Sequence, residues 1–136
     1  MSYNFTQEQL ERYKRNINLK EIGLIGQEKI LNAKVLIIGA GGLGSSASLY
    51  LAALGIGTLG IVDKDKVELS NLQRQIIHNT LDLDKPKVIS AKEKITNLNP
   101  DINVITYDQK ITKDNIMDIL INYNFIIDAT DNFETK

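Results

Sequence analysis

The chain has 136 residues, 43% of them hydrophobic and 24% charged, which fits one globular domain with a core of its own. Sixteen basic and seventeen acidic residues leave a formal net charge of −1, so neither a nucleic-acid partner nor a membrane surface is indicated. The chain has no cysteine, which excludes a disulfide, a thiolate zinc site and a cysteine nucleophile within it. Without a signal-peptide pattern or a long apolar run, we expect a cytoplasmic protein.

Two short helices are predicted at the start of the chain. Thr6-Gln7-Glu8-Gln9 has the pattern of a capping box, so a helix begins there and carries Arg12 and Arg15 toward its end. A second helix is predicted over residues 24–31, and the apolar residues that we expect to be buried in it are Ile25, Ile30 and Leu31. We expect residues 1–33 to form an N-terminal helical segment ahead of a Rossmann-like domain over residues 34–136.

The next stretch is an apolar strand, residues 34–38, that runs into a glycine-rich turn and a helix to Leu54. In such a turn Gly39 makes the tight bend, Gly41 leaves room for a phosphate, and Gly44 lets the helix pack against the strand. A second strand, residues 58–62, ends at Asp63, at the spacing of a ribose acceptor. The pattern is typical of a nucleotide site, but it does not distinguish a dinucleotide from a mononucleotide.

The remaining elements continue the alternation of strands and helices. A long polar loop, residues 64–84, precedes a helix from Pro86 to about residue 98, a strand over residues 102–107, a helix over 114–123 and a strand over 125–128. This order predicts an α/β, doubly wound, Rossmann-like parallel sheet with strand order 3-2-1-4. Its ligand is expected beyond the carboxyl ends of the first and fourth strands.

Charged residues near the turn favour a polyphosphate ligand. The loop contains Ser70-Asn71-Leu72-Gln73-Arg74-Gln75, and Lys87 follows Pro86. Together with the glycine turn, Arg15 in an Arg-Tyr-x-Arg-Asn context, Asp63-x-Asp65 and Ala129-Thr130-Asp131-Asn132, these blocks resemble the ThiF/MoeB/HesA family of ubiquitin-activating-like adenylyltransferases. The resemblance runs from Arg12 to Asn132.

The resemblance implies ATP-dependent adenylylation of the C-terminal carboxylate of a ubiquitin-like sulfur-carrier protein of the MoaD/ThiS type, in molybdopterin or thiamine biosynthesis, with release of pyrophosphate. It implies a site for ATP and Mg²⁺, with Asp131 as the metal ligand. The catalytic residues that it implies are Arg15, Arg74, Lys87 and Asp131, and Arg15 would reach the partner's phosphates across a homodimer. The nucleotide contacts that it implies are Gly39, Gly41, Gly42, Gly44, Asp63, Asp65, Ser70, Asn71, Leu72, Gln73, Arg74, Lys87, Asp131 and Asn132.

Family members are longer than this chain, so we expect the domain to be truncated at its carboxyl end. The cysteines that bind zinc in full-length relatives have no counterparts here. The alternatives left open are a catalytically incompetent nucleotide-binding or scaffold fragment and, more weakly, an NAD-linked oxidoreductase, which would not explain Arg74 or Lys87. An uncovered fourth strand would also favour self-association.

Several residues have a purely structural interpretation as well. The sole role of Asp63 could be to cap a turn, and that of Asp131 to cap a helix. Arg74 and Lys87 could be ordinary solvated charges. No role is assigned to His78, the only histidine. Packing is the expected role of two further side chains, Tyr50 and Met117.

Overall fold

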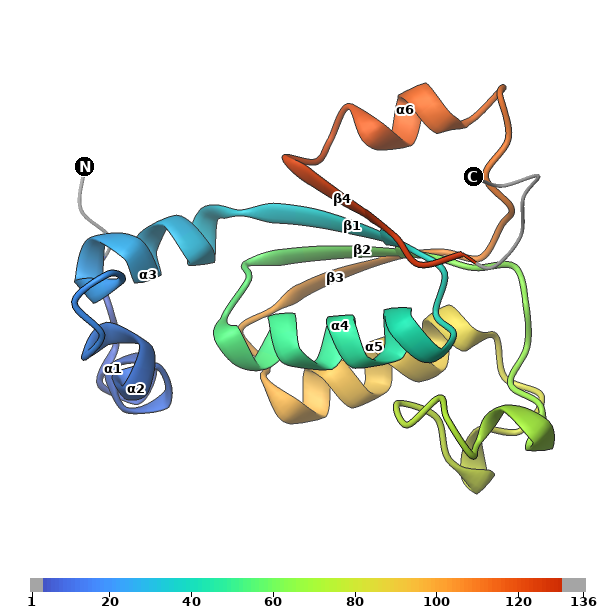
Figure 1. Cartoon of the computed structure of the whole chain (residues 1–136), viewed down its shortest axis with the longest axis horizontal. Helices are drawn as coiled ribbons and strands as arrows, with labels where there is room; N and C mark the ends of the chain where they lie inside the picture. The colour runs from blue at the N-terminus through green and yellow to red at the C-terminus, as the bar shows by residue number, and fades with distance from the viewer. Residues whose placement is uncertain (1–3, 131–136) are drawn as a thin grey trace.

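Four strands pair in parallel in the order β3-β2-β1-β4 in the computed structural model, which describes residues 4–130 (Figure 1). The strands are β1 (Lys34–Ile38), β2 (Thr58–Val62), β3 (Asn103–Tyr107) and β4 (Phe125–Asp128). β1 lies between β2 and β4 and pairs with both in parallel. The predicted sheet and its strand order are confirmed, so the switch point at which ligands bind in such folds lies between β1 and β4.

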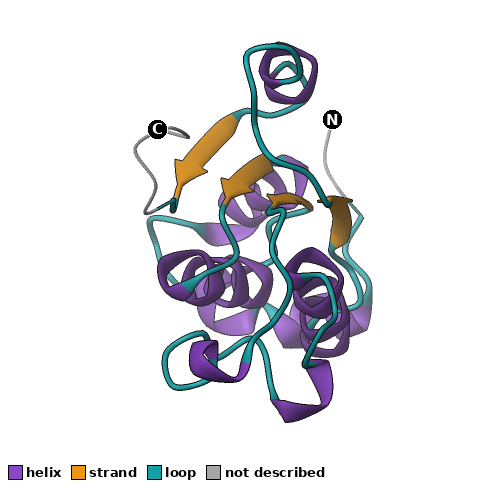
Figure 2. Ribbon diagram, turned by 90° about the vertical axis from the view of Figure 1, so that its right-hand side faces the viewer, coloured by secondary structure: helices purple, strands orange, loops and turns teal. Residues whose placement is uncertain are grey.

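Helices cover both faces of the sheet (Figure 2). On one face α4 (Gly42–Leu54) and α5 (Lys87–Leu98) pack beside each other, and on the other lies α6 (Ile116–Leu120). Successive residues of β1 therefore belong to two hydrophobic cores, one on each face of the sheet. Val35 and Ile37 pack with α4 and α5, whereas Leu36 and Ile38 pack toward α6. Burial on both faces explains why this strand is apolar without interruption.

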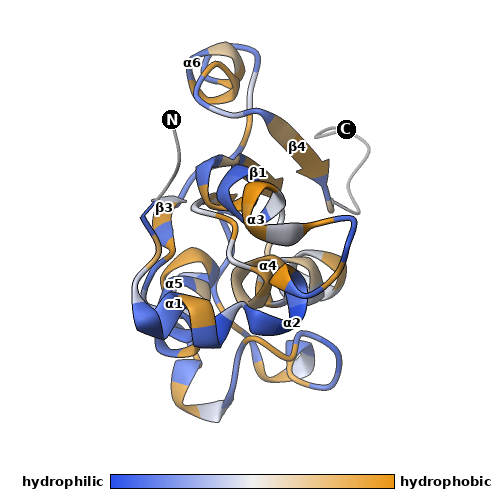
Figure 3. Ribbon diagram, turned by 90° about the vertical axis from the view of Figure 1, so that its left-hand side faces the viewer, coloured by the Kyte–Doolittle hydropathy of each residue, from blue (hydrophilic) through white to orange (hydrophobic). Residues whose placement is uncertain are grey.

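The N-terminal helices α1 (Gln7–Arg12), α2 (Lys14–Ile17) and α3 (Gly23–Asn32) lie at the amino ends of the strands, the end that Figure 3 faces. The predicted capping box is present, since Thr6 and Gln9 each accept a hydrogen bond from the other's backbone. The hydroxyl of the buried Tyr13 donates to Asp101 and accepts from Asn99. These bonds tie the helical segment to the connection between α5 and β3.

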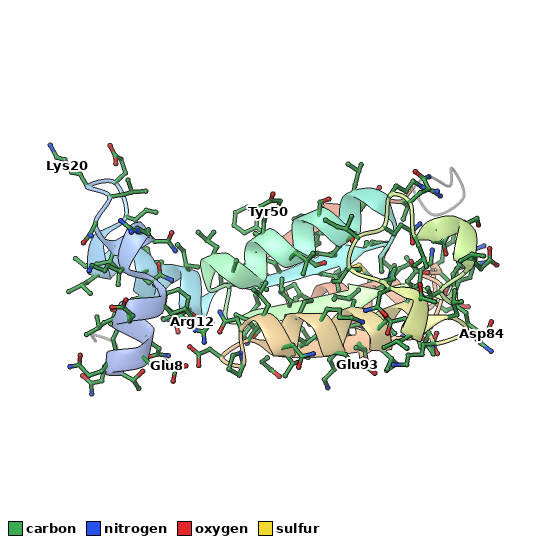
Figure 4. The ribbon with its side chains drawn as sticks, turned by 90° about the horizontal axis from the view of Figure 1, so that it is seen from below. Glu8, Arg12, Lys20, Tyr50, Asp84 and Glu93 are labelled. Carbon is green, nitrogen blue, oxygen red and sulfur yellow. The ribbon has the colours of Figure 1, made fainter. Side chains whose placement is uncertain are left out.

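Three side chains expected in the core are exposed instead: Ile25 at 73%, Tyr50 at 77% and Met117 at 70%. Each lies two positions from a buried residue of its own helix, and two positions are a rotation of about 200° around an α-helix. Tyr50 accordingly projects from α4 on the side away from α5 (Figure 4). The buried face of α4 consists of small residues, Gly44, Ser45, Ser48 and Ala52, which let the helix approach the sheet closely.

The long loop after β2 contains two short 3₁₀ turns, η1 (Leu69–Asn71) and η2 (Thr80–Asp82), and leads to α5, whose N-cap is Pro86. Helix α6 is shorter than the predicted 114–123, because residues 114 and 115 form a turn before it. Within residues 4–130, no helix is both long and apolar enough to cross a bilayer.

Candidate functional site

A cavity of about 480 Å³ opens at the carboxyl ends of the strands. Every strand contributes the segment that follows it: the glycine turn after β1, residues 63–65 after β2, residues 109–111 after β3 and residues 129–130 after β4. Side chains of the long loop and Lys87 complete the wall. The cavity therefore lies where a doubly wound fold places its ligand.

The glycines of the turn fall into two kinds. Gly39 has a φ of +103°, and a Cβ on Gly44 would lie 1.8 Å from the carbonyl oxygen of Gly39, so the fold itself requires glycine at both. A Cβ on Gly41 would meet only the Gln75 side chain at 3.5 Å, and one on Gly42 would meet nothing within 4 Å. Both of these glycines line the cavity. Their missing side chains leave space for a ligand rather than relieve a clash.

The carboxylate of Asp63 holds this turn in place. Its Oδ2 accepts a hydrogen bond of 2.8 Å from the backbone N–H of Ala40, and its Oδ1 accepts one of 2.8 Å from that of Asp65. Asp63 also lines the cavity. Asp63 therefore has a structural role in the turn, and the ribose contact implied by the family resemblance stays a prediction.

Backbone donors face the cavity at the start of α4. The hydrogen bonds of residues 4–130 include none donated by the backbone N–H groups of Gly41, Gly42 and Leu43, all three of which line the cavity. The helix dipole adds partial positive charge at the same point. Unpaired N–H groups at the start of a helix are donors that commonly bind anions, and α4 is 13 residues long.

Two cations stand beside these donors. Lys87 is only 7% exposed, and Arg74 reaches no acceptor closer than the carbonyl oxygen of Ser70, at 3.4 Å. Neither takes part in an ion pair within the described part of the chain. Both side chains line the cavity, so their positive charge is available to a ligand there. Together with the backbone donors, these cations favour a ligand with negative charge.

The loop that carries Arg74 is anchored to the turn and to α4. The buried Ile77 donates its backbone N–H to Ser45 Oγ at 2.8 Å, and the buried Asn71 accepts from the backbone N–H of Glu68. Gln75 is 3% exposed, lines the cavity and leaves its Oε1 without a partner within residues 4–130. A long polar loop is thus rigidly placed at the site.

His78, for which no role was predicted, is buried behind the glycine turn. Its Nε2 lies 3.1 Å from the carbonyl oxygen of Ala40 and its Nδ1 lies 2.7 Å from Ser90 Oγ. Burial lowers the pKa of this imidazole. Nearby, burial raises the pKa of Asp82, but hydrogen bonds from Lys94 and the backbone N–H of Asn79 outweigh it and hold the pKa at about 2.

The structure brings most of the implied nucleotide contacts to one cavity, namely Gly39, Gly41, Gly42, Asp63, Asp65, Asn71, Arg74 and Lys87. Four others lie outside its lining: Gly44, Ser70, Leu72 and Gln73. Arg15 lies on α2, at the opposite end of the sheet (Figure 1). Asp131 and Asn132 fall outside the described residues, so their implied roles, including the metal ligand, stay predictions.

Ten lining residues were not among the predicted contacts: Ile38, Leu43, Val62, Lys64, Gln75, Ala129, Thr130, Gln109, Lys110 and Ile111. The last three follow the end of β3 after one intervening residue, so the rule that strand ends meet at one edge would have found them. Gln75 lay in the quoted motif, but burial of its side chain in the wall depends on how the loop folds.

Comparisons with known proteins agree with this geometry. The sequence model of the ThiF family matches residues 13–136. The probable adenylyltransferase/sulfurtransferase MoeZ of Mycobacterium tuberculosis is 45% identical over 131 residues, which are 96% of this chain and 33% of MoeZ. The sulfur carrier protein ThiS adenylyltransferase of Escherichia coli is 47% identical over 125 residues, 92% of this chain and 50% of that protein.

A solved structure extends the similarity to three dimensions. The Escherichia coli tRNA N6-threonylcarbamoyladenosine dehydratase TcdA, in complex with ATP, matches with a TM-score of 0.88 at 28% identity. The match covers 96% of this chain and 53% of TcdA. The chain thus spans about a third to a half of the length of the relatives named here. Because the family pattern covers residues 13–136 and the fold and turn agree with it, the chain belongs to the ThiF family.

Proposed function

We propose that the cavity binds ATP and that the chain adenylylates the C-terminal carboxylate of a small ubiquitin-like sulfur carrier, releasing pyrophosphate. The observation that carries this proposal is the pairing of buried, unneutralised Lys87 with unpaired N–H groups at the start of α4. Both groups bind anions well, and a polyphosphate chain can contact both at once. The names of the MoeZ and ThiS-adenylyltransferase relatives support the same reaction class.

The proposed reaction requires positive charge at the phosphates. A carboxylate oxygen of the carrier forms a bond to the α-phosphorus, and the bond from that phosphorus to the pyrophosphate oxygen breaks. Both reactants are anions, so the N–H groups of Gly41 and Gly42 with Arg74 and Lys87 would neutralise charge where it develops. Asn71 would contact the same phosphates, and Asp63 would hold the ribose hydroxyls while it fixes the turn.

Two parts of the proposal involve groups beyond the cavity wall. Asp131, the proposed Mg²⁺ ligand, would supply a carboxylate oxygen of the kind that this hard cation prefers, and the cation would neutralise phosphate charge. Within residues 4–130, no group of three or more acidic or histidine side chains could hold a metal. Arg15 lies at the far end of the sheet, so it would act only in the cavity of a second copy, in a homodimer.

The carrier is proposed to be of the MoaD or ThiS type, in molybdopterin or thiamine biosynthesis. The chain spans a third to a half of the length of the named relatives. Binding of the carrier by this chain, and catalysis by it, are therefore both proposed. A nucleotide-binding fragment without catalysis is the alternative, and the cavity alone is compatible with it.

The test is exchange of labelled pyrophosphate into ATP, measured with and without a ThiS-type or MoaD-type carrier. We expect exchange that depends on the carrier and that falls at least tenfold in Lys87→Met, since a charge-assisted contact contributes about 1.5–3 kcal/mol. The matched control is Lys92→Met on the exposed side of the same helix. Equal exchange in Lys87→Met and the control would contradict the proposed site.

A further inference from the structure

The buried His78 joins three segments that are distant in the sequence. It lies on the long loop, its Nδ1 is 2.7 Å from the hydroxyl of Ser90 on α5, and its Nε2 is 3.1 Å from the carbonyl oxygen of Ala40 in the glycine turn. His78 is 4% exposed and Ser90 is fully buried. The imidazole is not in the cavity lining, so it reaches a ligand only through the turn.

The partners fix the tautomer of this imidazole. A carbonyl oxygen only accepts hydrogen bonds, so Nε2 carries the proton and donates it to Ala40. Because burial lowers the pKa of His78, the ring is neutral near pH 7 and Nδ1 is an acceptor. The hydroxyl of Ser90 donates to it. The carbonyl oxygen of Ala40 therefore keeps the proton of His78 on Nε2, the nitrogen that faces the turn.

Ala40 is consequently held on both sides. Its N–H donates to Asp63 Oδ2 at 2.8 Å, and its carbonyl oxygen accepts from His78. The peptide bond that follows is trans, so its carbonyl and its N–H, which belongs to Gly41, point in opposite directions. The Gly41 N–H is unpaired within residues 4–130, and Gly41 lines the cavity.

We propose that His78 is a positioning residue that directs the Gly41 N–H at a phosphate group of the bound nucleotide. This inference rests on the proposed ATP site. Without the His78 hydrogen bond, the peptide between Ala40 and Gly41 can rotate, and its N–H loses the direction toward the phosphate. The loop itself keeps a second anchor, because the backbone N–H of Ile77 still donates to Ser45.

The test compares two side chains of similar length. His78→Gln retains an N–H donor that can reach Ala40, whereas His78→Met removes the donor and keeps an apolar chain. Calorimetry with ATP and with adenosine is expected to show about tenfold weaker ATP binding in His78→Met, while adenosine binds within twofold of the original chain. His78→Gln is expected to recover ATP binding to within about threefold. Ile76→Met, on the exposed side of the same loop, is the control.

Two results of this comparison would overturn the inference. One is unchanged ATP binding in His78→Met, and the other is an equal loss of ATP and adenosine binding, which a merely structural role predicts. If His78→Met does not fold, Ser90→Ala replaces it, because it keeps the imidazole and removes the hydrogen bond at Nδ1 that orients the ring. In Ser90→Ala a selective loss of ATP binding of about threefold supports the inference, and equal binding rejects it.

A second measurement separates this inference from the proposed function. Inorganic pyrophosphate is titrated against ¹⁵N-labelled chain while the Gly41 amide resonance is followed. A shift of that resonance in the original chain and in His78→Gln, but not in His78→Met, supports the role of His78 even if the chain does not bind ATP. An equal response in all three chains, or none in the original chain, overturns it.

Discussion

Gly44 is the position at which the backbone of α4 passes closest to the glycine turn. A Cβ there would lie 1.8 Å from the carbonyl oxygen of Gly39 and 2.9 Å from its carbonyl carbon. Ordinary contact begins at 3.4 Å, so the methyl group of Gly44→Ala would be about 1.6 Å too close to a backbone atom. Neither atom can move unless the helix or the turn moves. We therefore expect a loss of at least about 3 kcal/mol, the upper end of the usual cost of overpacking.

Urea unfolding, followed by circular dichroism, measures this loss. With a slope of about 1–3 kcal/mol per molar urea, the midpoint of Gly44→Ala should fall by at least about 1 M. Gly42→Ala is the matched control, because its Cβ would meet nothing within 4 Å and alanine is a good helix former. The control should unfold at or slightly above the original midpoint. Equal midpoints for both variants would refute the proposed close approach of helix and turn.

Three further outcomes follow from hydrogen bonds around the site. Ser45→Ala removes the acceptor of the buried Ile77 N–H, so the free energy of unfolding should fall by about 1–3 kcal/mol. The Ile77 amide should also exchange faster with deuterium. An unchanged exchange rate would refute the role of this hydrogen bond in anchoring the loop. Folding lowers the pKa of His78, so the unfolded chain binds the proton at a higher pH than the folded chain does. The free energy of unfolding should therefore fall as the pH drops below about 6.5. Urea unfolding at several pH values measures this loss, which His78→Gln should remove. The pKa of Asp82 is about 2 instead of 3.8, which contributes about 2 kcal/mol of stability above pH 4. This contribution should disappear as the pH falls toward 2. In Asp82→Asn, which lacks it, the free energy of unfolding should lose correspondingly less over the same pH range.

The sheet could be predicted from sequence because its signals are local. Uninterrupted apolar strands, a glycine turn and a helix after each strand determine a doubly wound fold and its order. The faces of the helices could not be predicted in the same way. Ile25, Tyr50 and Met117 are apolar, yet α3 and α4 use Gln27, Ser45 and Ser48 on their buried faces, where hydrogen bonds replace apolar packing.

The location of the site was predictable for a similar reason. Strand ends and glycines mark the cavity in the sequence, and Asp63, Arg74 and Lys87 all lie in its lining. The burial of Lys87 without a counter-ion and the hydrogen bond from His78 to Ala40 could not be predicted, because they depend on how the long loop folds back on α4. These contacts join residues far apart in the sequence and leave no periodic signal.

The central claim is that this cavity is an ATP site rather than a dinucleotide site. Isothermal titration calorimetry of the chain with ATP and magnesium, and separately with NAD, tests it most directly. We expect saturable binding of ATP that weakens at least tenfold in Arg74→Ala, and no comparable binding of NAD. Tight binding of NAD without any response to ATP would contradict the account.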